Sequence, residues 1–219
     1  MRRLPSSRRL DFCRRASAGA LSALLAACGS APVTHWHSLM PEAVPAAGAI
    51  APAPAKEPIV VELEAVRLPT QVDQPQWLVR LPDGSLAVLE QERWASSLRD
   101  ELRDALLETL IVRHGVVEAH EASRTKARPI RVAIDVRRFD SLPGREARIE
   151  GSWTLVGAEL RVAPARCEWF YRENADGPPG ALAGAHRRAV ARLADGIGAA
   201  LKTLSRGERP VCPAPDDAA

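Results

Sequence analysis

Residues 128–139, "RPIRVAIDVRRF", decide how the second half of this 219-residue chain is folded. Apolar side chains recur at every second position, and charged side chains fill most of the positions between them. Strict alternation of this kind is typical of a β-strand with one face in a core and the other in solvent. The apolar positions are Ile130, Val132, Ile134 and Val136. We predict a half-buried strand here.

The next two segments continue this pattern. Residues 146–156, "EARIEGSWTLV", alternate in the same way, with Ile149, Gly151, Trp153 and Leu155 on one face. Gly157-Ala158 predicts a turn into a third strand, "ELRVAPARCEWFYRE", at residues 159–173. Together the three segments predict an antiparallel meander.

The first half of the mature chain predicts strands followed by a helix. "PIVVELEAVRLP" (58–69) has the β-branched content of a strand, and "QWLVRLPDGSLAVLE" (76–90) predicts a hairpin around the turn at 82–85. The apolar period then changes to three and four residues, which favours an amphipathic helix. Its apolar positions are Trp94, Leu98, Leu102, Ala105, Leu106 and Leu110. We interpret the charged residues of "EQERWASSLRDELRD" (90–104) as the solvated face of this helix.

A second amphipathic helix is predicted over residues 180–204, with Gly207 and Pro210 ending it. Small residues on its apolar stripe would let it lie close to a sheet. The expected fold class is therefore α/β, in the sense of mixed α+β. We predict one mixed β-sheet packed against two long amphipathic helices, in the order β-β-β-α twice, in a single domain.

The N-terminus has the layout of an export signal. Six arginines precede a short apolar stretch, "ASAGALSALLAA" (16–27), which is too short for a spanning helix of about 20 residues. Leu25, Ala26 and Ala27 lead to Cys28 as in the lipobox of bacterial lipoproteins, so we expect Cys28 to be acylated. The alternative is an ordinary secretory signal peptide that a cysteine follows by chance. Gly29 and Ser30 beside it favour the outer membrane, facing the periplasm.

The charge balance changes when this signal is removed. The whole chain has 30 basic and 27 acidic residues, and removing six arginines and one aspartate leaves 24 and 26, a net charge of −2. Because the mature chain also has no basic stripe with interleaved aromatics, we expect no nucleic-acid partner. Acyl chains would supply the membrane contact.

Only Cys167 and Cys212 remain as side-chain thiols in the mature protein, because Cys13 leaves with the signal and Cys28 is acylated. In an oxidising compartment they could form a disulfide that ties the tail to a strand, or remain two separate thiols. The sequence leaves both possibilities open.

No catalytic, cofactor or metal site is predicted. "HEASR" at His120 lacks the second histidine of a zincin motif, and the chain has no nucleophile elbow or phosphate loop. His35 and His37 would share one face of a strand, but no cysteine or carboxylate lies near them in sequence to complete a metal site. We therefore do not expect an enzyme.

The mature chain resembles the PqiC (YmbA) family of ABC-type transport auxiliary lipoproteins. The resemblance begins with Cys28 and an aromatic element at His35, Trp36, His37 and Leu39. Three further matches follow in the family's order. They are a strand end at Val66, Leu68 and Pro69, a "D-x-P-Q-x-V-x-R" element at Asp73, Pro75, Gln76, Val79 and Arg80, and the "R-W-A-x-x-L" start of the first helix at Arg93, Trp94, Ala95 and Leu98. His37, where the family usually has tyrosine, and the Ala/Pro-rich segment after Met40 depart from the pattern.

The resemblance implies a noncatalytic lipoprotein that docks an MCE-domain protein of a lipid transport system. It also implies domain boundaries: a signal at 1–27, a lipidated tether at 28–34 and the auxiliary lipoprotein domain at 35–212. Within that domain, 40–58 would be a loop or linker. Residues 213–219, after the domain, would be a disordered tail. A homo-oligomer is one possibility, with Trp77, Trp94 or Trp169 as exposed interface candidates, although each of these tryptophans is more often a core residue. The alternatives are a chaperone that holds phospholipid between helix and sheet, and an envelope hydrolase.

Overall fold

The computed structural model describes residues 32–42, 58–122, 128–157, 163–214 and 216. From Thr34 onward the chain forms one compact unit. The expected signal at 1–27, Cys28, the turn residue Ala158 and most of the 40–58 segment lie outside the described residues.

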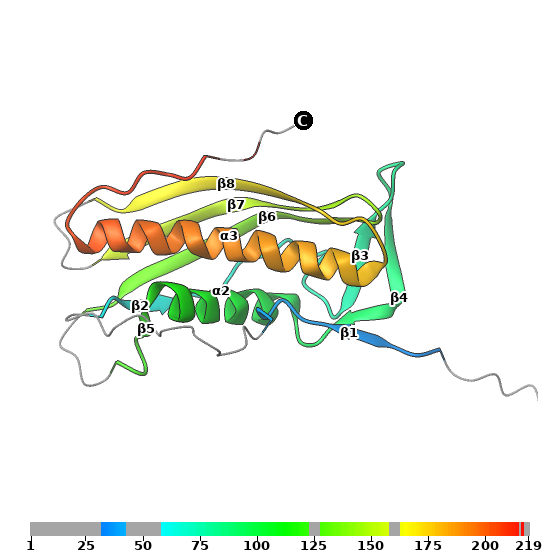
Figure 1. Cartoon of the computed structure of the whole chain (residues 1–219), viewed down its shortest axis with the longest axis horizontal. Coiled ribbons are helices and arrows are strands. Elements are labelled where there is room, and N and C mark those ends of the chain that lie inside the picture. Colours follow the sequence, from blue (N-terminus) through cyan, green and yellow to red (C-terminus); the bar gives the residue numbers. More distant parts are fainter. Residues whose placement is uncertain (1–31, 43–57, 123–127, 158–162, 215, 217–219) are drawn as a thin grey trace, which may run out of the picture. The chain divides into compact units, whose positions relative to one another are not determined.

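The predicted meander forms the last three strands of a five-stranded sheet with the order β5-β2-β6-β7-β8 (Figure 1). Its strands are β2 (Val60–Leu63), β5 (Val117–Glu118), β6 (Ile130–Leu142), β7 (Glu146–Gly157) and β8 (Ala165–Asn174). β6, β7 and β8 are antiparallel, with Ile134 opposite Trp153 and Trp153 opposite Cys167. β2 runs parallel to both β5 and β6. The sheet is therefore mixed, as predicted, although the two-residue strand β5 was not predicted.

Two long helices cover one face of this sheet (Figure 1). They are α2 (Leu98–His114) and α3 (Pro179–Ser205), and α3 packs on β7, β8 and α2. The alternating residues of the meander that face them are buried, including Val132, Trp153 and Leu155. The fold class of two helices on a mixed sheet in one domain is thus confirmed.

The first helix begins later than its apolar period indicated. Trp94 is the last residue of strand β4 (Leu86–Trp94), and α2 begins at Leu98 after the N-cap Ser97, whose side chain accepts a hydrogen bond from the Asp100 backbone. Trp94 lies four residues before Leu98, so it matches the helical period by chance. The prediction that residues 90–94 form the solvated face of the helix is therefore wrong.

The remaining strands form a second, three-stranded sheet rather than part of the first. Its order is β1-β4-β3, with β1 (His35–His37), β3 (Gln76–Arg80) and β4 (Leu86–Trp94). β3 and β4 form the predicted hairpin, and β1 runs parallel to β4. The expectation of a single sheet is corrected here. A hydrophobic core common to both sheets joins them, because Trp77 and Val79 belong to the same buried cluster as Val132 and Leu193.

Two glycines permit close approaches in this core. A Cβ on Gly151 of β7 would lie 2.1 Å from the backbone oxygen of Asp135 and 2.7 Å from the Trp169 ring. A Cβ on Gly198 of α3 would lie 2.3 Å from the ring of His114 at the end of α2. Gly198 therefore permits a close contact of α3 with the end of α2.

Candidate functional site

The two histidines near the N-terminus do not converge on one site. His37 forms a hydrogen bond with the Glu92 carboxylate, and its ring lies edge-on to Trp77 at 4.9 Å, whereas His35 is exposed. Among the described residues no group of three or more His, Cys, Asp or Glu side chains is placed to hold a metal ion. Within the same residues, no helix combines the length and hydrophobicity needed to cross a bilayer.

Three residues of the family motifs form one row across the three-stranded sheet. Trp36 on β1 lies opposite Arg93 on β4, and Arg93 lies opposite Gln76 on β3. Side chains of residues directly opposite each other project from the same face of a sheet. Trp36 is 63% exposed, so this row lies on the outer face, away from the core.

The other motif residues have structural contacts. Leu39 is buried, and its backbone N–H donates to the Glu101 carboxylate at 2.8 Å. Pro75 accepts a hydrogen bond from the Trp94 backbone at 2.9 Å, which fixes the bulge between β3 and β4. Arg80 donates to Asp140 on β6 from both Nε and Nη2, at 3.2 and 3.0 Å. These contacts tie the N-terminal sheet to the helices and to the large sheet.

The tryptophans proposed as interface candidates are buried. Trp77, Trp94 and Trp169 are each at most 2% exposed, so the prediction that they are exposed is wrong. Trp77 and Trp94 pack against each other with ring centroids 4.3 Å apart. Their large apolar surface is used to fill the core where the two sheets and α3 meet.

A buried histidine that sequence reasoning missed lies at the same place. His186 of α3 stacks on Phe139 with ring centroids 4.0 Å apart and an interplanar angle of 7°. Its Nε2 lies 2.8 Å from the Ser141 hydroxyl, which also accepts a hydrogen bond from Trp77 Nε1 at 2.9 Å. Burial lowers the pKa of His186 to about 3. The histidine is therefore neutral at physiological pH and joins α3 to both sheets.

The face of the five-stranded sheet that the helices leave uncovered is polar and charged. We call this the open face; its residues include Arg131, Asp135, Glu150, Thr154 and Glu168. They alternate along each strand with the buried residues that face α2 and α3, as expected for a sheet covered on one side.

A chain of ion pairs crosses this open face. Arg166 pairs with Glu168 on β8, and Glu168 pairs with Arg137 on β6. Arg137 and Arg138 both lie 3.6 Å from the Glu150 carboxylate. The chain ends with Asp140, which is shared by Arg138 and Arg80. The pair with Arg137 contributes to lowering the pKa of Glu168, against the effect of desolvation.

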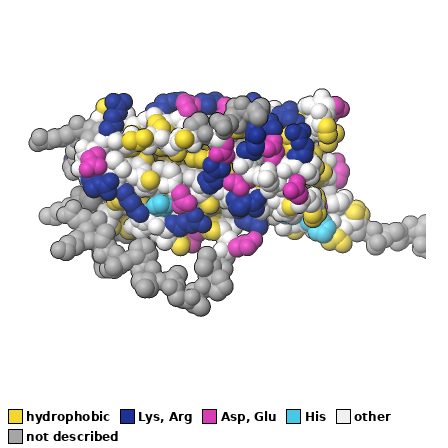
Figure 2. Space-filling model, turned by 45° about the horizontal axis from the view of Figure 1, so that its top comes forward, with side chains coloured by type: hydrophobic (Ala, Val, Ile, Leu, Met, Phe, Trp, Pro, Cys, Tyr) yellow, Lys and Arg dark blue, Asp and Glu magenta, His cyan; other side chains and the backbone are white. Residues whose placement is uncertain are grey.

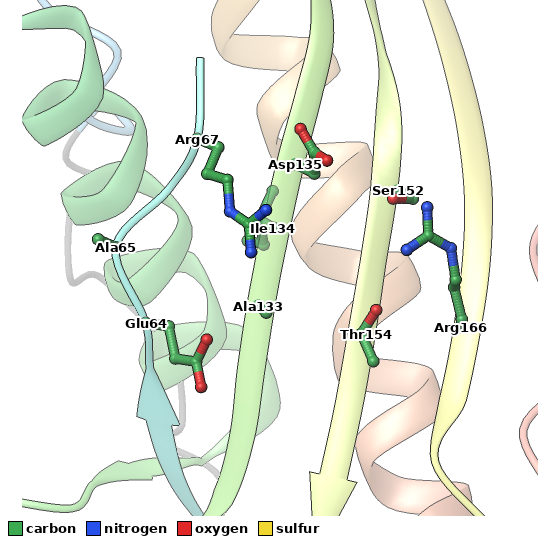
Figure 3. A pocket seen from close by; sticks show the side chains of 9 residues that line it. All are labelled: Glu64, Ala65, Arg67, Ala133, Ile134, Asp135, Ser152, Thr154 and Arg166. Carbon is green, nitrogen blue, oxygen red and sulfur yellow. The ribbon is translucent and has the colours of Figure 1, made fainter.

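A small cavity lies on the open face over β6 and β7, between residues 64–67, which follow β2, and Arg166 of β8 (Figure 3). It encloses about 70 Å³, far below the roughly 300 Å³ of typical ligand pockets. The Arg67 and Arg166 side chains lie on opposite sides of it (Figure 3). The lining residues are Glu64, Ala65, Arg67, Ala133, Ile134, Asp135, Ser152, Thr154 and Arg166. The cavity has room for a few water molecules at most.

The C-terminal segment covers the free edge of β8. Cys167 and Cys212 form a disulfide across 45 residues of sequence. Farther along, the Asp216 backbone donates to Phe170 and its carboxylate accepts from the Arg172 backbone, at 3.0 and 2.8 Å. The expected disordered tail is therefore wrong at Asp216. Backbone groups of an edge strand need partners, and this segment supplies them.

Comparisons with known proteins agree with this geometry. Residues 41–198 match the family model described as ABC-type transport auxiliary lipoprotein component. The crystal structure of an uncharacterized protein aligns with a TM-score of 0.58 at 15% identity, covering 76% of this chain and 97% of that one. A Xanthomonas campestris protein of family DUF330 aligns with a TM-score of 0.52 at 24% identity, covering 71% and 92%. No curated protein matches the chain.

Proposed function

Because this chain belongs to the ABC-type transport auxiliary lipoprotein family, we propose that it is a noncatalytic docking component of an MCE-type lipid transport system. Acyl chains on Cys28 would hold it on the periplasmic face of the outer membrane. From there it would bind the MCE-domain protein that carries lipid between the two membranes. It would hold the MCE-domain protein at the outer membrane by binding it, and it would catalyse no reaction.

The open face is the observation that carries this proposal. It is broad, built on three long antiparallel strands, and crossed by the chain of ion pairs from Arg166 to Arg80. Arginine is enriched in protein interfaces because its guanidinium can donate several hydrogen bonds in a fixed plane. An ordered face of this kind supports docking of a polar protein partner.

The packing of the domain gives no support to the chaperone alternative. The space between the helices and the large sheet is filled by buried side chains, among them Ile134, Trp153, Leu193 and Ile197. A groove that holds an acyl chain would need this space to be open. The cavity on the open face is polar and encloses only about 70 Å³. We therefore propose docking alone.

The proposal is tested by affinity capture from detergent-solubilised envelope. The bait is the intact lipoprotein, and Cys28→Ser removes the acylation site. A second pair of variants tests the face: Glu168→Arg reverses a charge within the ion-pair chain, and Lys202→Glu reverses an exposed charge on α3. Docking predicts that an MCE-domain protein is recovered with the intact bait and with Lys202→Glu, and at least tenfold less with Glu168→Arg. Recovery of phospholipid without any MCE-domain protein would contradict it.

A further inference from the structure

Exposed apolar side chains concentrate on the three-stranded sheet. In the part of Thr34–Ala219 that the structure describes, seven large hydrophobic side chains are exposed. Four of them belong to this sheet or to its turn: Trp36 (63%), Leu81 (37%), Leu86 (43%) and Val88 (39%). Figure 2 shows charged and hydrophobic side chains interspersed over the visible face, and hydrophobic side chains are also present at the end where β4 lies.

Three of these side chains, Trp36, Leu86 and Val88, share one face of the sheet, and Leu81 lies in the turn beside it. Along β4, Ala87 and Leu89 pack against the core and Leu86 and Val88 are exposed. The register shifts between Leu89 and Arg93, so that Trp94 is again buried and Arg93 projects outward with Trp36. We call this the hairpin face; the register places on it Trp36, Gln76, Leu78, Arg80, Leu86, Val88, Glu90 and Arg93. Leu78 is half-buried and also packs against the core, and Arg80 is held by Asp140 at the border with the open face.

The composition of the hairpin face fits the interfacial zone of a bilayer. Tryptophan favours the headgroup level of membranes because one part of its ring system is apolar and its N–H is polar. Arg93 lies opposite Trp36 and can contact lipid phosphates, while the exposed Glu90 lies nearer the middle of β4. Leu86 and Val88 add apolar area farther along the strand.

The short segment between Cys28 and β1 also favours a membrane surface as the partner of the hairpin face. Only residues 29–34 separate Cys28 from His35, and six extended residues span at most about 20 Å. If acyl chains on Cys28 enter the bilayer, β1 must lie within that distance of its surface. We propose that the hairpin face rests on the phospholipid surface of the membrane that holds the anchor. This inference rests on the proposed anchorage of Cys28, and it leaves the open face for the protein partner.

The five tryptophans make a direct test possible. Trp36 is exposed, whereas Trp77, Trp94, Trp153 and Trp169 are at most 2% exposed. Brominated acyl chains quench tryptophan emission only at close contact. The acylated protein is reconstituted into vesicles of phosphatidylethanolamine and phosphatidylglycerol, with and without brominated chains. We expect a loss of emission that disappears in Trp36→Phe.

Tryptophan reporters at two positions distinguish contact of the hairpin face with lipid from anchorage of the protein alone. In the Trp36→Phe background, Val88→Trp places a reporter on the hairpin face and Val112→Trp places one on α2, where Val112 is 54% exposed. We expect quenching with Val88→Trp and none with Val112→Trp. If the protein floats with the vesicles but Val88→Trp is not quenched, the face is not on lipid and the inference fails. If the protein does not float at all, the anchorage itself fails, and with it the proposed function.

Discussion

Arg192 on α3 holds Asp216 in the C-terminal segment through two hydrogen bonds, 2.7 Å from Nη1 to Oδ2 and 2.6 Å from Nη2 to Oδ1. This contact lowers the pKa of Asp216 and raises that of Arg192. The same guanidinium lies over the Tyr171 ring, 4.5 Å from its centroid. The end of the described chain is therefore tied to both the helix and the strand whose edge it covers.

Asp216→Asn should weaken this tie. Because Arg192 is 40% exposed and Asp216 is 28% exposed, solvent screens the pair, and we expect a loss of about 0.5–1 kcal/mol in the free energy of unfolding. Urea unfolding followed by circular dichroism measures it. The control is Glu208→Gln, since the pair of Glu208 with Arg206 is about 60% exposed on both sides. If the two variants lose the same free energy of unfolding, the contact of Arg192 with Asp216 stabilises the protein no more than an exposed ion pair does.

Removing the disulfide should cost more than removing the ion pair. Cys167 and Cys212 close a loop of 45 residues, for which the chain-entropy estimate is about 4 kcal/mol and typical measured values are about 2–4 kcal/mol. The double variant Cys167→Ala/Cys212→Ala should therefore have a much lower urea midpoint than the oxidised protein. It should match the wild type under reducing conditions. An unchanged midpoint would mean that the tail does not constrain the domain.

His186 makes stability depend on pH in the acid range. Its pKa is about 3 in the folded state, below the ordinary value of 6.5. The unfolded state therefore binds a proton more readily, and stability is lost as the pH falls from 6.5 toward 3, by at most about 1.4 kcal/mol per pH unit. His186→Phe keeps the stacking on Phe139 and should flatten this slope. His35→Gln, at an exposed position, serves as the control and should leave the slope unchanged.

Gly151→Ala should disrupt the meander. The added Cβ would lie 2.1 Å from a backbone oxygen of β6, which cannot move without breaking the ladder, so we expect a loss of at least about 2 kcal/mol. Gly180→Ala is the matched control, because a Cβ there has no neighbour within 4 Å. A fall in melting temperature for Gly151→Ala alone is the expected result. Equal melting temperatures for both variants would contradict the packing described here.

Much of the fold could be predicted from local pattern. Strict alternation around Ile134 and Trp153 predicted β6 and β7, and the stripe of α3 from Leu182 to Leu204 predicted that helix closely. These elements bury one face along their whole length, so their period is clear in the sequence. β5 was missed because two residues carry no period.

The features that could not be predicted from the sequence depend on pairing between segments far apart in the chain. The division into two sheets follows from β1 pairing with β4, and strand order leaves no local pattern. The tryptophan predictions failed because size and polarity make the residue equally suited to a core and an interface. His186 is on the apolar stripe of α3, and that position was the one signal that could have identified a buried histidine.

Photo-crosslinking in cells tests the central claim, docking through the open face, most directly. A photoreactive residue is placed at Arg131 on the open face, or at Lys202 on α3, in the otherwise intact lipoprotein; both positions are exposed. Mass spectrometry then identifies the crosslinked partner. The account predicts that an MCE-domain protein is crosslinked from position 131 and not from position 202. Crosslinking to that protein from position 202 alone would place the partner on the helices and contradict the account.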